Sequence, residues 1–258
     1  MTQLLASACD DREALDAAAP NVAEPIAHPM ASASLIESLR SSLWGRALTP
    51  AEFDRVSCEA FERQVPAGGF VARMGQPVEH WIGVIEGLLK MSVTSPDGKV
   101  STLTGIRVGG WFGEGSLLKR EPRRYDVVAL RASRVALVPH ATFERLRATS
   151  LPFNHHLHHL MNARLSLFIG MLEYDRLLST DARVARCLAT LFNTDLYPDP
   201  RPYVDLRQHE IGLLCGMSRQ RANVALRTLQ NCGLIRVEPR GVTVLELDGL
   251  RNFAGVPT

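Results

Sequence analysis

Apolar residues recur at helical spacing through the middle of the chain, between residues 153 and 178. The repeated gaps of three and four place side chains on one face of an α-helix, so this segment predicts one long amphipathic helix. A helix of that length spans roughly 35–40 Å, more than one small domain can cover. We therefore expect part of the apolar stripe to meet a second copy of the chain, with packing wholly on its own domain as the alternative. The stripe consists of Leu157, Met161, Leu165, Phe168 and Leu172.

From residue 65 to residue 138 the pattern changes to short apolar stretches separated by glycine, proline and Asp-Gly. Asp97-Gly98 lies between two such stretches, and both residue types tolerate the positive φ angles of a tight hairpin. Eleven of the 19 glycines fall between Gly68 and Gly115. Repeated tight corners between short strands are typical of a small antiparallel barrel or roll.

Two short helical stretches and a hairpin follow near the C-terminus. Gly216 can take the left-handed conformation that ends a helix, and the hydroxyl of Ser218 can cap the next one. Small residues at Gly212, Ala222 and Ala225 permit the close crossing of a helix-turn-helix. The strand, turn and strand that come next predict a wing.

The start of the second helix of this motif carries side chains that bind nucleic acid. Arg219, Gln220 and Asn223 can contact base edges, whereas Ser218 and Arg221 can hold phosphates. This helix and the wing contain five arginines and one acid, a local charge of +4, although the whole chain carries only +2. The helix N-terminus adds free amide donors and partial positive charge. The sequence therefore predicts a surface for double-stranded DNA.

The composition is that of a globular protein and points away from several other classes. Of 258 residues, 46% are hydrophobic and 22% are charged, which suggests about two domains. No apolar run approaches the roughly 18 residues of a membrane span, and the first residues lack a secretory signal, so we expect a cytoplasmic protein without a membrane partner. No GxSxG, Walker or HExxH motif is present, so we do not expect an enzyme.

Neither the cysteines nor the histidines are spaced like metal ligands. The five cysteines are at least 17 residues apart, so no zinc site or iron-sulfur cluster is expected. The run from His155 to His159 has no cysteine or acidic neighbour in the sequence. We interpret it as a solvated helix start, with a metal or haem site or pH sensing as alternatives.

In these features the chain resembles the CRP/FNR family of bacterial transcription regulators, over about residues 46–248. The first half matches the family's glycine, Asp-Gly-Lys and Phe-Gly-Glu positions, and the second half matches its winged helix. The matching residues are Gly75, Gly87, Asp97, Gly98, Lys99, Gly110, Phe112, Gly113, Glu114, Arg123, Ala129 and Val135, then Glu210, Ile211, Gly212, Gly216, Ser218 and Arg219.

The resemblance implies an α+β fold with an antiparallel, jelly-roll-like β roll, a long dimerisation helix and a C-terminal winged helix-turn-helix. The expected segments are a flexible N-terminal extension at 1–45, a cyclic-nucleotide-binding-like effector domain at 46–150, the dimerisation helix at 151–178 and the DNA-binding domain at 179–258. The resemblance further implies a homodimer, with RNA polymerase as a second partner.

An effector site in the roll is also implied. By the family pattern, Gly113 would present backbone amides, Glu114 would accept a ribose hydroxyl and Arg123 would bind a cyclic phosphate. The family's Arg-Ser-Ala triplet, however, is Arg123-Arg124-Tyr125 in this sequence, which places a second arginine and a bulky ring at the candidate pocket.

The long helix departs from the family as well. It has Phe168 and Ile169 near the place where cyclic AMP binders have Thr and Ser against adenine. A site that depends on such hydrogen bonds binds much more weakly when they are missing. A cyclic nucleotide is therefore not the favoured effector, and the identity of the effector stays open.

These features together predict a dimeric, sequence-specific DNA-binding regulator whose operator affinity is controlled by an effector at the β roll and central helix. The alternative is a small-molecule sensor that signals through protein contact, with the winged domain as a docking module.

One local departure from the family pattern concerns Arg207, which stands where a Thr commonly caps the first helix of the motif. We expect that helix to fray slightly at its start.

Overall fold

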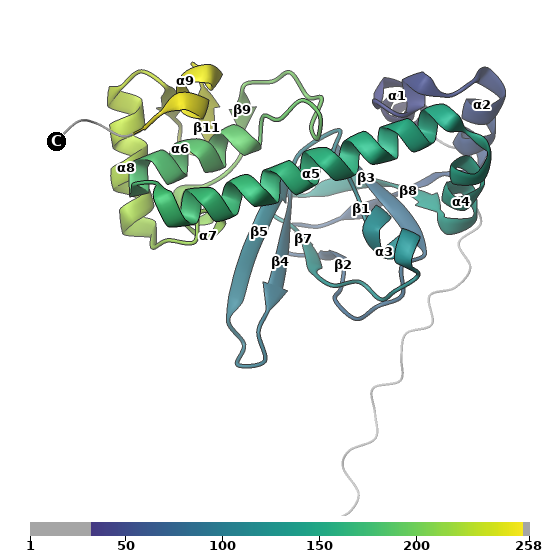
Figure 1. Cartoon of the computed structure of the whole chain (residues 1–258), viewed down its shortest axis with the longest axis horizontal. Helices are drawn as coiled ribbons and strands as arrows, with labels where there is room; N and C mark the ends of the chain where they lie inside the picture. The colour runs from purple at the N-terminus through teal and green to yellow at the C-terminus, as the bar shows by residue number, and fades with distance from the viewer. Residues whose placement is uncertain (1–31, 255–258) are drawn as a thin grey trace, which may run out of the picture.

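The computed structural model describes residues 32–254, in which a β roll, one long helix and a smaller helical domain follow one another (Figure 1). The fold class is α+β, as predicted. The helices are α1 (Ala33–Ser41), α2 (Pro50–Glu59), α3 (Glu114–Lys119), α4 (His140–Thr149), α5 (Leu151–Leu177), α6 (Thr180–Thr190), α7 (Gln208–Leu214), α8 (Arg219–Asn231) and α9 (Leu247–Asn252), with a 3₁₀ turn at Gly45–Ala47. The strands are β1 (Phe61–Val65), β2 (Phe70–Ala72), β3 (His80–Glu86), β4 (Leu89–Thr94), β5 (Val100–Ile106), β6 (Trp111–Phe112), β7 (Asp126–Ala129), β8 (Ser133–Pro139), β9 (Tyr203–Val204), β10 (Ile235–Val237) and β11 (Val242–Val244).

The roll consists of two four-stranded antiparallel sheets. One has the strand order β1-β8-β3-β6 and the other β2-β7-β4-β5. Asp97 and Gly98 form the turn between β4 and β5, where Thr94 pairs with Val100 and Gly98 has a φ of 82°. The predicted hairpin and antiparallel roll are confirmed.

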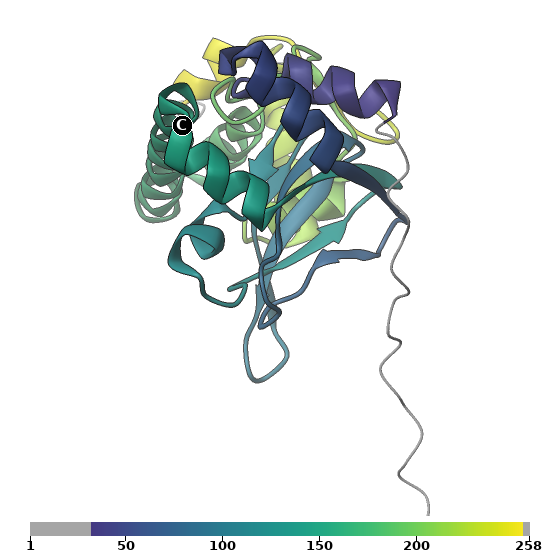
Figure 2. The same cartoon turned by 90° about the vertical axis from the view of Figure 1, so that its right-hand side faces the viewer.

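The N-terminal helices belong to the roll rather than to an extension. Ser32 caps α1, and Leu35 and Leu39, four positions apart, are fully buried. Trp44 is also buried, and its ring centroid lies 5.2 Å from that of Trp81. Figure 2 shows α1 and α2 lying together over the strands. The expected extension to residue 45 is therefore wrong for residues 32–45, and its remainder, residues 1–31, lies outside the described residues.

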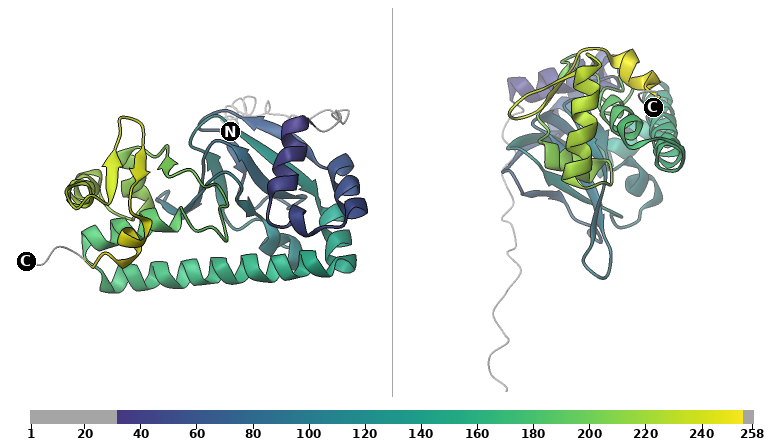
Figure 3. Two further views of the ribbon diagram at one scale, coloured as in Figure 1. Left: turned by 90° about the horizontal axis from the view of Figure 1, so that it is seen from above. Right: turned by 90° about the vertical axis from the view of Figure 1, so that its left-hand side faces the viewer.

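Helix α5 has 27 residues and runs along both the roll and the C-terminal domain (Figure 3, left). It is apolar on two sides. One side is buried against its own chain through Phe153, Leu157, Leu160 and Leu167. The other carries large apolar side chains that are 43–61% exposed, namely Met161, Leu165, Ile169 and Leu172. The predicted stripe is thus divided, since Leu157 packs inward and Phe168 is partly buried against the same core, whereas Met161, Leu165 and Leu172 face outward.

The C-terminal domain combines α6 to α9 with a small antiparallel sheet in the order β10-β11-β9. Gly216 has a φ of 64° in the turn between α7 and α8, as the motif requires. A Cβ atom at Gly212 would lie 3.1 Å from the carbonyl oxygen of Met217, so the two helices meet where only glycine fits well. Among residues 32–254, no helix combines the length and the apolar character needed to cross a bilayer.

Candidate DNA-binding surface and effector site

The first turn of α8 presents an uncovered polar surface. Ser218 caps the helix by accepting a hydrogen bond from the backbone nitrogen of Arg221 at 3.4 Å. Arg219, Gln220 and Arg221 are exposed, whereas Ala222 is fully buried beneath them. Helix α8 lies at the end of the molecule farthest from α1 and faces outward (Figures 1 and 3). The structure therefore brings four of the five predicted DNA-binding residues together on an accessible helix start.

Asn223 differs from the sequence prediction. Its side chain is half-buried, and its Oδ1 atom is buried without a hydrogen-bond partner among the described residues. Val224, in contrast, is 58% exposed and lies one turn after Gln220. Valine methyl groups can contact a thymine methyl in the major groove, as other apolar side chains do. The i, i+4 spacing from Gln220 could have identified Val224 from the sequence.

The first helix of the motif begins differently from what we expected at Arg207. The carboxylate of Glu210 accepts a hydrogen bond from the backbone nitrogen of Arg207 at 2.7 Å. A glutamate at the third helical position can satisfy a free amide in this way. This hydrogen bond secures the amide of Arg207, although no side chain caps the helix, and α7 is regular from Gln208 instead of frayed.

The wing follows α8 directly. Strands β10 and β11 pair from Ile235↔Val244 to Val237↔Val242. Arg236 and Arg240 are exposed on this hairpin, which lies in the same small domain as the start of α8. An exposed basic hairpin can contact the phosphate backbone beside a groove-bound helix.

Three of the predicted effector residues meet in the roll. Gly113 precedes α3 with a φ of 101°, and a Cβ atom there would lie 3.0 Å from Nη1 of Arg123. Glu114 and Arg123 are 4% and 5% exposed. The structure adds Arg164 of α5, whose Nη1 binds Oε1 of Glu114 and whose Nη2 binds the carbonyl oxygen of Trp111 at 2.7 Å. No local sequence feature indicates this pairing across 50 residues.

Tyr125 lies beside this site. The guanidinium carbon of Arg123 lies 5.9 Å from the centroid of the Tyr125 ring. Burial, and then the carboxylate of Glu114, raises the pKa of Tyr125, and burial lowers the pKa of Arg123. Two buried atoms, Nη1 of Arg123 and Oε2 of Glu114, have no hydrogen-bond partner among the described residues. The site therefore offers one free donor and one free acceptor beside an aromatic ring.

The other predicted effector residues lie elsewhere. Arg124 points to solvent and forms two hydrogen bonds to Glu121, at 3.2 and 2.9 Å. Phe168 lines a separate groove of about 470 Å³ together with Leu103. Ile169 is 57% exposed on the outer side of α5. Within one chain, the structure does not bring these three to the pocket of Arg123.

Two family models match the chain over most of the described residues. Residues 62–150 match the cyclic nucleotide-binding domain, and residues 182–253 match the Crp-like helix-turn-helix domain. The chain belongs to the CRP/FNR family of transcription regulators. The order of roll, long helix and helix-turn-helix in the structure agrees with both matches.

Two known relatives of this CRP/FNR protein match along most of their own length. The CRP-like cAMP-activated global transcriptional regulator of Mycobacterium tuberculosis is 27% identical over 192 residues, which cover 73% of this chain and 86% of the relative. The cyclic AMP receptor protein of Thermus thermophilus is 29% identical over 210 residues, covering 80% and 94%. Among solved structures, FixK2 of Bradyrhizobium japonicum superimposes with a TM-score of 0.63 at 18% identity, covering 77% of this chain and 99% of FixK2. That last likeness concerns the fold alone.

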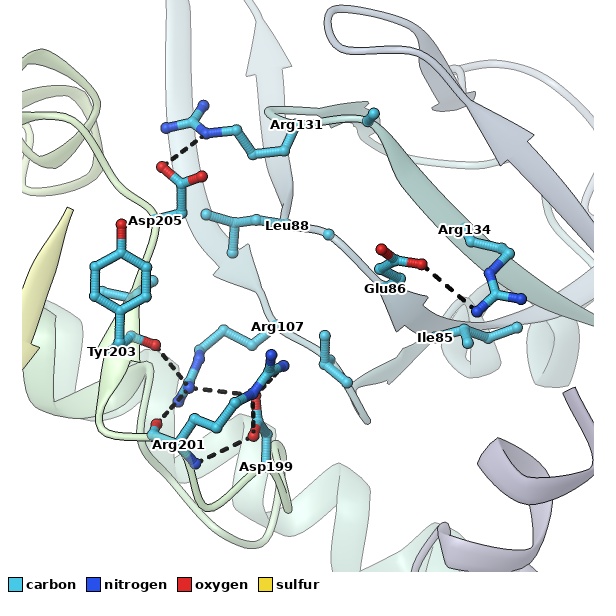
Figure 4. A pocket seen from close by; sticks show the side chains of 14 residues that line it. Ile85, Glu86, Leu88, Arg107, Arg131, Arg134, Asp199, Arg201, Tyr203 and Asp205 are labelled. Carbon is cyan, nitrogen blue, oxygen red and sulfur yellow. Dashed lines mark hydrogen bonds and ion pairs between the residues drawn. The ribbon is translucent and has the colours of Figure 1, made fainter. Parts of the chain in front are cut away.

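Within this CRP/FNR fold, polar contacts of two roll residues, Arg107 and Arg131, join the roll to the DNA-binding domain (Figure 4). Arg107, 3% exposed, donates from Nη1 to the carbonyl oxygen of Leu191 at 2.9 Å. Its Nη2 donates to the carbonyl oxygens of Arg201 and Tyr203 at 2.8 and 3.3 Å and lies 3.5 Å from the Asp199 carboxylate. One buried guanidinium thus holds the segment that enters the helix-turn-helix.

The histidine run is only partly a solvated helix start. His155, His158 and His159 are exposed, but His156 is half-buried with its ring centroid 6.4 Å from that of Trp81. His159 has an acidic neighbour that the local sequence did not show, because its Nε2 lies 3.3 Å from Oδ1 of Asp195. In the described part of the chain, no cluster of three or more His, Cys, Asp or Glu side chains is arranged to hold a metal ion.

The half-buried ring of His156 predicts acid sensitivity of the fold. Burial, and then the nearby His159, lowers the pKa of His156 from 6.5 to about 4. Between these two pH values the unfolded chain binds a proton that the folded chain does not, so stability falls as the pH drops through this window. Because one pKa unit corresponds to about 1.4 kcal/mol, this residue alone accounts for up to about 3 kcal/mol.

Urea unfolding at pH 7 and pH 4.5 checks this expectation. His156→Gln, which cannot be protonated, should lose less free energy of unfolding between the two pH values than the wild type. His155→Gln, on the exposed side, is the control and should behave like the wild type. Equal losses for the His156 variant and the wild type would contradict the assignment.

Proposed function

We propose that this protein is a dimeric, sequence-specific DNA-binding transcription regulator whose operator affinity is controlled by an effector at the roll and central helix. The exposed first turn of α8, with Ser218, Arg219, Gln220 and Arg221, is the observation that carries the proposal. Side chains of these types contact base edges and phosphates when a helix start enters the major groove. Several relatives are named as cAMP-activated transcriptional regulators, which supports the same role.

The outer apolar side of α5 supports a dimer. Exposed apolar side chains at Met161, Leu165, Ile169 and Leu172 form a continuous row at spacings of four, four and three, the pattern of a helix-helix contact. A twofold pair would place two α8 helices on one side of a duplex, with half-sites one helical turn apart, roughly 34 Å. Such a dimer would act where the chromosome lies, in the cytoplasm, with RNA polymerase as the further partner.

Selection of DNA from a random pool by the purified protein tests the function. A regulator of this kind should enrich a site with two related halves separated by about one helical turn. If no sequence is enriched, with or without cell extract, the alternative gains support, and the winged domain is then a docking module for another protein.

Arg219 should determine sequence preference and Arg221 should not. Arg219→Ala should cost about 1–3 kcal/mol per half-site on the selected operator and relax the preference at one base position. Arg221→Ala should weaken binding to matched and mismatched DNA alike and reduce the salt dependence, because a phosphate contact carries no sequence information. Titrations on matched and mismatched operators measure both effects, and equal losses on the two operators for Arg219→Ala would refute its role.

The effector site favours a ligand other than a cyclic nucleotide. The free donor of Arg123 and the free acceptor of Glu114 require an anionic or carbonyl acceptor and a hydroxyl or amine donor on the ligand. The ring of Tyr125 lies beside this pair, and Phe168 of α5, in the separate groove with Leu103, offers no hydrogen bond to a base. Cyclic AMP and cyclic GMP should therefore leave operator affinity unchanged, and a clear change with either would overturn this part of the proposal.

A further inference from the structure

Arg131 connects the roll to the first helix of the helix-turn-helix. It lies in the turn between β7 and β8, and its two terminal nitrogens each contact one oxygen of Glu210 on α7 at 2.8 Å. Its Nε lies 3.0 Å from Oδ1 of Asp205, as Figure 4 shows. The side chains of Arg131 and Glu210 are only 16% and 11% exposed. A bidentate pair shielded from water fixes orientation as well as distance.

Glu210 transmits this position to α7 and α8. The same carboxylate that binds Arg131 also accepts the amide hydrogen of Arg207, so it is fixed to the first turn of α7. Helix α7 in turn contacts α8 closely, since a Cβ atom at Gly212 would lie 3.4 Å from the Cα atom of Arg219. A shift of Glu210 relative to the roll would therefore carry the start of α8 with it.

Arg131 is the roll arginine that contacts α7 itself, and it lies at the edge of a pocket between the roll and the C-terminal domain. A pocket of about 580 Å³ opens between the roll and the segment 199–205, and Arg131 and Arg107 lie on its two sides. Across that space the two arginines make the polar contacts between the domains, and Leu88 of the roll adds an apolar contact to the core of the helical domain. Arg107 binds mainly backbone carbonyls before α7, whereas Arg131 binds the helix-turn-helix itself.

We propose that Arg131 is a positioning residue that sets the distance between the two α8 helices of the dimer on DNA. The inference rests on the proposed function, because the distance matters only if both helices contact one operator. Arg131 touches no DNA itself. It acts by holding Glu210, and hence α7 and α8, at one place relative to the roll and to α5.

Arg134 provides a matched control. It lines the same pocket only three residues after Arg131, and it is also a partly buried arginine in ion pairs. Its partners Glu62 and Glu86 and its hydrogen-bond acceptor Ser34 all belong to the roll and α1. Removing Arg134 therefore removes one positive charge and one partly buried side chain, as removing Arg131 does. It leaves the contacts of the helix-turn-helix intact.

Operators with altered spacing test the proposal on the full-length dimer. The selected operator is compared with versions whose spacer is longer or shorter by one or two base pairs, and with a single half-site. The wild type should discriminate sharply against the altered spacers. Arg131→Met should bind the best operator about tenfold more weakly and discriminate less between spacers, while half-site binding stays unchanged. Arg134→Met should behave like the wild type in all three measurements.

A second variant separates positioning from general damage to the fold. Glu210→Gln keeps an oxygen for the amide of Arg207 but loses the charge that binds Arg131. It should reproduce the relaxed spacing, and combining it with Arg131→Met should add little, because both remove one interaction. Arg131→Lys, which retains a cation, should restore part of the discrimination.

The outcomes distinguish the two proposals. If the wild type selects no two-part operator, the proposed function itself fails. If the wild type discriminates between spacers and Arg131→Met discriminates equally well, the function stands and the positioning role of Arg131 is wrong. Weaker half-site binding by Arg131→Met would likewise overturn it, because the effect would then lie within one DNA-binding domain.

Discussion

Leu165→Glu should convert the dimer to a monomer and lower operator affinity by about a hundredfold or more. Leu165 is 58% exposed at the centre of the outer apolar row of α5. Two carboxylates facing each other in such a contact repel and lose hydration, so the helices separate. Each monomer then binds one half-site alone. Linking two binding modules typically raises the overall affinity by a factor of roughly 10²–10⁴, and the monomer loses this gain.

Sedimentation and DNA titration measure this expectation. Ser166→Glu introduces the same charge at the next exposed position of α5, away from the apolar row, and should leave both mass and affinity unchanged. A Leu165→Glu protein that stays dimeric would show that the outer row of α5 is not the subunit contact.

Arg107→Ala should strongly destabilise the protein, by about 3–5 kcal/mol, because it leaves buried polar groups without a partner. Three backbone carbonyls, at Leu191, Arg201 and Tyr203, lose their donor. The guanidinium also lies 4.2 Å from the centroid of the Phe192 ring, so a cation-π contact is lost.

Urea unfolding should show the loss as a lower midpoint. Arg55→Ala is the control, since Arg55 is 64% exposed in an ion pair with Glu59 and should contribute less than about 1 kcal/mol. Similar small effects of both substitutions would mean that the carbonyls near Arg107 find other donors.

The sequence was most informative where a pattern depends on residues close together in the chain. The spacing of apolar residues predicts α5, and the Asp97-Gly98 turn predicts the β4–β5 hairpin. Gly216 with Ser218 predicts the turn before α8 and the cap of α8. Each of these signals arises from local backbone conformation. The exposure of Asn223 was less predictable, because a helical position beside Ala222 is covered or free depending on the elements that pack against it.

Contacts between distant residues carried no such local signal. Glu114 and Arg164 are 50 positions apart, and Arg131 and Glu210 are 79 apart. Nothing in the neighbourhood of either arginine indicates its partner, because the pairing depends on how the roll, α5 and α7 are arranged in space. Helix α1 was missed for a related reason, since Leu35 and Leu39 are buried by parts of the roll that are distant in the sequence.

The way Arg107 binds also has a consequence for how this protein can vary. Its hydrogen-bond acceptors are main-chain oxygens, which every amino acid possesses, so the side chains at positions 191, 201 and 203 are not specified by this contact. Position 107 has no such freedom, because only a guanidinium reaches all three oxygens at once. Substitutions should therefore be tolerated at these three positions during evolution as long as the backbone conformation is kept. A single substitution at residue 107 would weaken the contact between the β roll and the C-terminal domain.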